Sequence, residues 1–182
     1  VFVSTPDLLA DVDYAIWCPV AVDTERWSAP RADRGERLRV AHAPSVAGLK
    51  GTQLIEPALE DLAARGAIDW RLVQGVPSSS MPEVFAHTDV LLDQFLAGSY
   101  GVAAVEAMSA GCVVVGHVLD DVRTTVREVT GLELPVVEAT PDTVAQVVVE
   151  LADDPARVDR LRAEGIDFAR EVHDGRLSAD IL

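Results

Sequence analysis

Residues 38–52 read LRVAHAPSVAGLKGT, and this stretch decides the fold class. Its first six residues predict a strand, and the residues after Gly51 begin a pattern with helical periodicity. Four further apolar runs follow, at residues 70–73, 90–92, 112–115 and 134–137, with helical patterns between them. Strands that are apolar throughout are typical of a parallel sheet that helices cover on both faces. The sequence therefore predicts an α/β protein with a parallel sheet between two layers of helices.

Local signals divide the chain further. An apolar helical stripe over residues 54–63 ends at Gly66. Thr140 and Asp154 each precede a proline, which predicts two capped helices within residues 141–182.

Domain boundaries follow from composition. Residues 19–36 are rich in Pro, Asp, Arg and Ala and lack sustained periodicity, which is typical of a connector. The chain opens on Val1 with a strand-like run that has no partner before it, so we interpret it as a piece of a longer protein. We expect residues 1–36 to be the end of an upstream domain with its connector, and residues 37–182 to be the sheet domain.

Composition and charge bound the class of protein. With 182 residues, 49% of them hydrophobic, the chain can bury a core of its own. Its formal net charge of -15 argues against nucleic acid or an anionic membrane as a partner, because an acidic surface repels polyphosphate. No apolar stretch approaches the roughly 20 residues that a membrane-spanning helix needs, so no transmembrane segment is expected.

Cysteines and histidines give no sign of a metal centre. Cys18 and Cys112 form neither a disulfide framework nor a metal-ligand spacing. The four histidines are dispersed, so structural or solvent-facing roles are expected for them. We expect no metal, and a reducing, cytoplasmic environment.

The loop after the first strand carries Lys50, which is the only lysine in the chain. Ligands of open α/β sheets bind at the carboxyl ends of the strands, where this loop lies. Its ammonium is expected to give a cationic spot that holds a phosphate by a charge-assisted hydrogen bond; the alternative is a surface lysine on a turn. The loop is not a Walker A motif, and no GxGxxG follows a strand, which disfavours P-loop ATPases and dehydrogenases.

A second loop, residues 98–111, reads GSYGVAAVEAMSAG and opens a helix of small residues. Free N–H groups at a helix start favour phosphate binding. Glu106, further into the helix, could accept the hydroxyls of a ribose, or could be a solvated helix former. Gln94 and residues 78–80 lie in loops at the same edge, where they line the pocket or only turn the chain.

Together, residues 42–45, 49–52, 93–94, 98–101 and 106–111 resemble in order and spacing the C-terminal, donor-binding domain of retaining GT-B glycosyltransferases. The resemblance implies a Rossmann-like domain, one half of a GT-B fold, that binds a nucleotide sugar. It implies that Lys50 contacts the diphosphate, that the backbone of residues 99–102 holds phosphate and that Glu106 binds the ribose. It also implies transfer of the sugar to an acceptor without metal or cofactor, and a missing N-terminal acceptor domain without which this chain is inactive.

The residues expected at the site follow from these patterns. The expected catalytic residues are Lys50 and Glu106. The expected donor-binding residues are Ser45, Lys50, Gly51, Gly75, Gln94, Ser99, Tyr100, Gly101, Val102 and Glu106.

The sequence departs from the family pattern twice. Many such enzymes have a glutamate eight positions before the one that corresponds to Glu106, where this chain has Gly98. They also commonly have an arginine shortly before the lysine, where residues 46–48 are Val-Ala-Gly. The alternatives are therefore a non-catalytic nucleotide-binding or scaffold domain of the same fold, or half of a nucleotide-sugar epimerase. A flavodoxin-like regulatory domain is disfavoured, because its acidic cluster after an early strand is missing.

Overall fold

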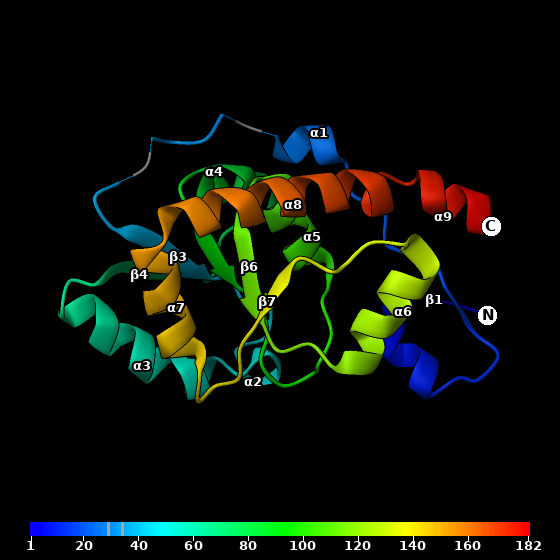
Figure 1. The fold of residues 1–182 in the computed structure, drawn as a ribbon, viewed down its shortest axis with the longest axis horizontal. Coiled ribbons are helices and arrows are strands. Elements are labelled where there is room, and N and C mark those ends of the chain that lie inside the picture. Colours follow the sequence, from blue (N-terminus) through cyan, green and yellow to red (C-terminus); the bar gives the residue numbers. More distant parts are fainter. Residues whose placement is uncertain (29, 34) are drawn as a thin grey trace.

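A five-stranded parallel sheet forms the centre of the protein (Figure 1). The computed structural model describes residues 1–28, 30–33 and 35–182. The sheet has the order β4-β3-β5-β6-β7. Its strands are β3 (Leu38–His42), β4 (Ile68–Leu72), β5 (Val90–Leu92), β6 (Val113–Gly116) and β7 (Val136–Glu138). Every one of the five predicted apolar runs overlaps one of these strands, with ends displaced by at most two residues, and the predicted fold class is confirmed.

Helices cover both faces of this sheet (Figure 1). One face packs against α4 (Met81–Ala86), α5 (Val102–Ser109) and α8 (Pro155–His173), and the other against α3 (Thr52–Ala64) and α7 (Val144–Asp153). The remaining helices are α1 (Thr24–Trp27), α2 (Ala47–Lys50), α6 (Asp120–Thr130) and α9 (Arg176–Ile181), with short 3-10 turns η1 (Pro6–Ala10) and η2 (Ser78–Ser80).

Successive side chains of the central strand β5 enter different cores. Leu91 belongs to the cluster under α5 and α8, whereas Val90 and Leu92 belong to the cluster under α3 and α7. All three are at most 1% exposed. Burying each such side chain stabilises the fold by roughly 1.5–3 kcal/mol. The strand is apolar throughout because both of its faces are covered.

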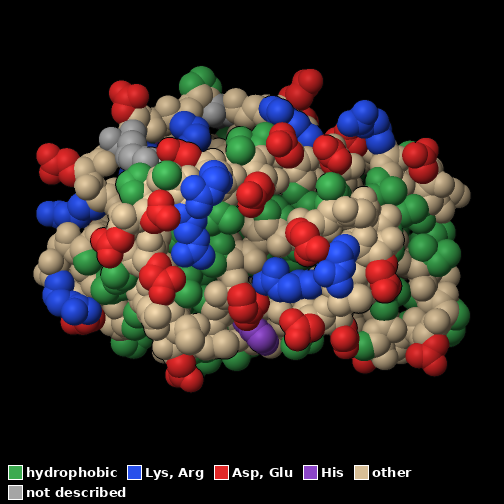
Figure 2. Space-filling view, viewed as in Figure 1, with side chains coloured by type: hydrophobic (Ala, Val, Ile, Leu, Met, Phe, Trp, Pro, Cys, Tyr) green, Lys and Arg blue, Asp and Glu red, His purple; other side chains and the backbone are tan. Residues whose placement is uncertain are grey.

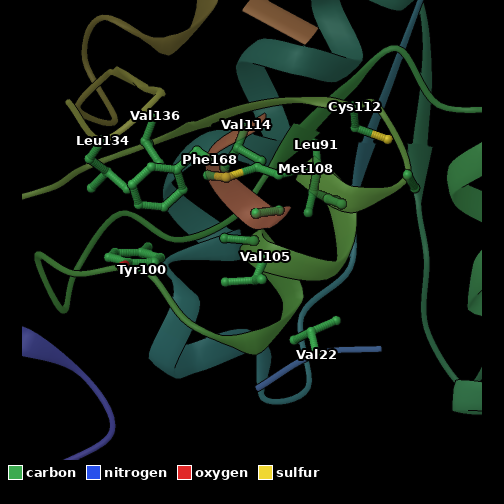
Figure 3. Close-up of a cluster of buried hydrophobic side chains, with 14 of the residues drawn as sticks. Val22, Leu91, Tyr100, Val105, Met108, Cys112, Val114, Leu134, Val136 and Phe168 are labelled. Carbon is green, nitrogen blue, oxygen red and sulfur yellow. The ribbon is translucent and has the colours of Figure 1, made fainter. Parts of the chain in front are cut away.

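The cluster under α8 joins the end of the sheet to the last long helix. Figure 3 shows Phe168 of α8 beside Leu134 and Val136, with Met108 and Val114 close to it. Each of these five side chains is at most 6% exposed. This packing positions α5, whose first turn lies at the candidate site.

The start of the chain forms a separate, two-stranded parallel sheet. β1 (Phe2–Val3) pairs with β2 (Ile16–Trp17), and η1 lies between them in sequence. The opening strand therefore pairs with a strand that follows it in the chain. In Figure 1 this part lies beside α6, which contacts η1.

The C-terminal region holds three helices rather than the two that were predicted. Asp154 caps α8 as expected, because its side chain accepts a hydrogen bond of 2.9 Å from the N–H of Arg157. The predicted cap at Thr140 is wrong: α7 begins at Val144. The N–H of Thr140 donates to Oγ1 of Thr143 at 2.9 Å, so a local side-chain bond replaces the cap and delays the helix.

A buried carboxylate ties three distant segments at the amino end of β5. Asp89 is 1% exposed and accepts hydrogen bonds from Nε and Nη2 of Arg39, both at 2.9 Å. Arg31 and Arg162 also bond to it. Burial would raise the pKa of Asp89, but the bonds from Arg39 and the charges of Arg39 and Arg162 outweigh it and lower that pKa to about 2. The connector, β3 and α8 are thus joined at one ion-pair network.

His173, at the end of α8, holds the connector on the other side. Its Nδ1 donates to the carbonyl of Val20 at 2.8 Å, and its own carbonyl accepts from the N–H of Val22 at 2.7 Å. Nε2 is then left to accept from the hydroxyl of Tyr100 at 3.2 Å, so the imidazole is neutral. Burial lowers the pKa of His173 to about 4, although the bond to Val20 opposes this.

This burial makes stability depend on pH. As the pH falls below 6.5, an unfolded histidine takes up a proton that folded His173 refuses until about pH 4. The unfolded state is stabilised over that window, so the free energy of unfolding should fall by up to roughly 3 kcal/mol between pH 6.5 and 4. Urea unfolding of the wild type and His173→Gln at several pH values measures this, and the gap between the two curves should change across the window. His87→Gln, at an exposed histidine, is the control; parallel profiles for wild type and His173→Gln would contradict the prediction.

Candidate functional site

A pocket of about 290 Å³ opens at the carboxyl ends of β3 and β5. Its walls come from Thr5, Asp7, Ser45, Leu49, Lys50, Asp93, Gln94, Ala97, Ser99, Tyr100 and Gly101. The fold thus brings together the two loops that the sequence singled out, because β3 and β5 are neighbours in the sheet. Thr5 and Asp7 join them from the segment before β2.

Lys50 does not stand as a free cation in this pocket. Its Nζ donates to Oδ1 of Asp93, and the two side chains are 19% and 3% exposed. The charge of the expected cationic spot is therefore partly neutralised by Asp93. An ammonium has three N–H donors, however, and the bond to Asp93 uses one of them. Lys50 can neutralise Asp93 and still donate to an anion in the pocket.

Further bonds lock the two loops together. The carbonyl of Lys50 accepts from the N–H of Phe95 at 3.1 Å. His42 is fully buried: its Nδ1 donates to the carbonyl of Leu92 at 2.7 Å, and Nε2 accepts from the hydroxyl of Thr52 at 2.8 Å. Burial lowers the pKa of His42, and the charge of Lys50 adds to this effect. His42 is therefore a neutral structural brace that fixes the backbone around Lys50.

Gln94 shapes the turn that leads into α5. Its amide nitrogen donates to the carbonyl of Ser99, and its Oε1 accepts from the N–H of Ala97 at 2.8 Å. The backbone carbonyl of Gln94 accepts from the N–H of His117 at 2.9 Å. Both ends of the Gln94 side chain are thus occupied in holding the loop. Its side chain therefore positions Ser99 in the turn before α5.

The start of α5 follows directly after Gly101, which lines the pocket, and its first N–H groups lack an acceptor in the helix. In a helix that begins at Val102, the N–H groups of Val102 and Ala103 have no acceptor within the helix. Ser99 is 6% exposed, and among the described residues its hydroxyl finds no hydrogen-bond partner. Such groups, at the positive end of the helix dipole, are suited to an anion.

Tyr100 contributes to the pocket by its backbone. Its ring is 4% exposed and lies edge-on to Phe168 and His173, with centroids 6.3 and 5.7 Å apart. Burial raises the pKa of the Tyr100 hydroxyl, which bonds to His173. The side chain therefore anchors the turn to α8 and is not available to a ligand.

Glu106 lies near the site but does not line the pocket. It is half-buried on α5. Burial raises the pKa of its carboxyl, and the charges of Arg26 and Lys50 partly offset this. Those charges place Glu106 within electrostatic reach of Lys50 and of Arg26 on α1, a residue that the sequence did not single out.

Besides Glu106, three further expected residues lie outside the pocket wall: Gly51, Gly75 and Val102. Gly51 has a φ of 78° and joins α2 to α3, so it sets the direction in which Lys50 leaves the backbone. Gly75 also has a positive φ, of 67°, in the loop after β4. Sequence reasoning also missed Asp7, which gave no local signal, and the role of Asp93 as the partner of Lys50.

A larger hollow, of about 670 Å³, lies between β7 and α8 and is not an anion site. Five carboxylates line it, with a single arginine. Figure 2 looks onto this face, where acidic and basic side chains lie around apolar ones. The potential there repels phosphate, so we place the candidate site in the smaller pocket.

Among the described residues there is neither a metal-binding cluster nor a membrane-spanning helix. Within residues 1–28, 30–33 and 35–182, no three His, Cys, Asp or Glu side chains gather as a metal ion would require. In the same ranges no helix has the length and hydropathy needed to cross a membrane.

Comparison with known proteins gives structural relatives only. No family model and no curated protein matches the sequence. Solved structures match it: sucrose-phosphate synthase from Thermosynechococcus elongatus (TM-score 0.70, 14% identity), HepE from Anabaena in complex with UDP (0.68, 12%) and a glycosyltransferase from Rickettsia africae (0.67, 11%). Each match covers 100% of this chain but only 56, 62 and 61% of the solved chain.

These relatives define the fold. The resemblance inferred from the sequence is confirmed at that level, and the chain folds as one half of a GT-B glycosyltransferase. It spans less than two thirds of the proteins that it matches.

Gly98 sits where no other residue fits easily. Its φ is 70°, and a Cβ there would lie 2.6 Å from Cγ of Leu119. Its carbonyl also accepts from the N–H of Leu119 at 2.9 Å. The glutamate that the family pattern places at this position would need a different loop conformation.

Gly98 and Gly75 form a matched pair for testing this crowding. Both have a left-handed φ, but a Cβ at Gly75 meets no atom of the described chain within 4 Å. Gly75→Ala should cost about 1 kcal/mol of unfolding free energy from backbone strain alone. Gly98→Ala should cost roughly 1 kcal/mol more, because Leu119 must move. Adding Leu119→Ala to Gly98→Ala should recover this excess. Urea unfolding measures all three, and equal costs at the two glycines would rule out crowding by Leu119.

Proposed function

We propose that this chain is the nucleotide-sugar-binding domain of a retaining glycosyltransferase, which moves a sugar from a nucleoside diphosphate to an acceptor. One observation carries the proposal: one pocket is lined by Lys50, by Ser99, whose hydroxyl has no hydrogen-bond partner among the described residues, and by Gly101, the residue directly before α5. The fold supports it, since a relative of the same fold was solved with UDP.

In the proposed reaction the protein stabilises the charge of the departing nucleoside diphosphate. Lys50 donates to the diphosphate while keeping its bond to Asp93, and the N–H groups of Val102 and Ala103 donate to phosphate oxygens. Donors fixed in advance lower the barrier because they need no rearrangement as charge develops. Glu106 accepts hydroxyls of the ribose. No metal or cofactor is needed in this scheme.

The proposal includes a second domain. Because the chain spans 56–62% of the relatives, we infer that residues 1–36 end an upstream domain that brings the acceptor, and that this chain alone binds donor without turning it over. Both cysteines are free thiols, which fits a cytoplasmic enzyme.

A second function is a nucleotide-binding domain without catalysis. Asp93 neutralises Lys50, and Gly98 stands where the family pattern has a glutamate near the sugar. Such a domain would bind the nucleoside diphosphate and its sugar equally well, because nothing in it would grip the sugar. Comparing the two affinities separates it from the enzyme.

The proposal predicts opposite effects at the two partners of the ion pair. Calorimetric titration of UDP, GDP, ADP and dTDP and of their sugars should find binding to at least one. Asp93→Asn should bind that ligand at least as tightly, because the ammonium loses its competing carboxylate. Lys50→Gln combined with Asp93→Asn should bind it roughly 10- to 100-fold more weakly, which is about 1.5–3 kcal/mol.

The double variant avoids leaving a buried carboxylate unpaired, so a loss of binding is not a loss of fold; circular dichroism checks this. Arg65→Ala is the control for charge, since Arg65 is 64% exposed and bonds only to Asp61 among the described residues. Arg39 is unsuitable, because its removal disturbs Asp89. Absence of binding to every ligand at millimolar concentration would refute the proposal.

A further inference from the structure

Asp7 lines the pocket from outside the sheet domain, and one oxygen of its carboxylate is left unpaired among the described residues. Its Oδ1 is buried and, among the described residues, has no hydrogen-bond partner. It lines the same 290 Å³ pocket as Lys50 and Ser99. A buried oxygen without a partner is destabilising, so its retention at a pocket needs a reason.

A structural role does not account for this carboxylate. Asp7 lies in the first turn of η1, where a side chain could cap the helix start, but Oδ1 makes no such bond. The N-cap position belongs to Thr5, whose side chain also makes no cap bond. Lys50 is engaged by Asp93 rather than by Asp7.

The pocket therefore offers hydrogen-bond donors as well as an acceptor. The hydroxyl of Ser99 and the first turn of α5 offer donors, which suit phosphate. Asp7 offers an acceptor only, because an ionised carboxylate has no proton to donate. It repels phosphate and favours a neutral group that carries hydroxyls. A ligand that fits both ends has a hydroxyl-bearing, uncharged part joined to an anionic part.

We propose that Asp7 forms a subsite for a sugar hydroxyl, so that the segment before β2 selects the nucleotide sugar over the free nucleoside diphosphate. This inference rests on the function proposed above and deepens it. Asp7 supplies a carboxylate near the sugar in a chain where Gly98 leaves no room for one on the loop before α5. Its partner is the hydroxyl-bearing half of the donor.

The test compares two affinities in each variant of the 182-residue chain. Calorimetry measures Kd for UDP-glucose and for UDP, or for the matched pair that the nucleotide screen identifies. Asp7→Ala should weaken binding of the nucleotide sugar about tenfold, because a charge-assisted hydrogen bond is lost. It should leave the affinity for the nucleoside diphosphate unchanged or raised, because a negative charge is removed. The ratio of the two constants is the readout that a merely structural role would not move.

Asp11→Ala is the matched control, since Asp11 is exposed at the end of the same η1 turn. It should leave both constants as in the wild type. If Asp7→Ala leaves the ratio unchanged, or weakens both ligands equally, the subsite is refuted while the proposed function stands. If the wild type binds neither ligand of any pair, both proposals fall.

Discussion

Two buried aspartates bracket the central strand β5, and the fold depends on the neutralisation of both. Asp89 precedes the strand and Asp93 follows it, and neither is more than 3% exposed. Removing the partner of a buried charge typically costs about 3–5 kcal/mol. Because β5 lies in the middle of the sheet, its two ends also determine where α8 and the loop that carries Lys50 are held.

Different cations neutralise Asp89 and Asp93, and this difference decides which end of β5 has a structural role and which can serve function. Three arginines surround Asp89, and Arg39 alone gives it two side-chain bonds and one backbone bond. A planar guanidinium that makes both side-chain bonds has a fixed orientation, and its charge is already neutralised. Lys50 is a point charge with spare donors, and a pocket opens beside it. The carboxyl end of β5 therefore keeps electrostatic capacity for a ligand.

The fold was predictable because both faces of the sheet are covered, which leaves each strand as an apolar run. The predicted cap at Thr140 failed because the side chain of Thr143 competes locally for the backbone, which periodicity does not reveal. Lys50 was recognisable from its uniqueness and its place after a strand. Its bond to Asp93 joins positions 43 residues apart, and depends on β3 and β5 being neighbours, so no local pattern contains it.

The candidate site also depends on the segment that the sequence assigned to an upstream domain. Trp17 and Trp27, both 3% exposed, are buried in the same core cluster as α5 and α8, and the ring of Trp27 lies 5.6 Å from that of Phe85. Tyr100 connects the turn before α5 to His173, and His173 is bonded to Val20 of the connector. The packing of Trp17 and Trp27 therefore helps to hold this turn in place. The predicted boundary at residue 37 describes the topology of the sheet. The pocket, however, is lined by residues on both sides of this boundary.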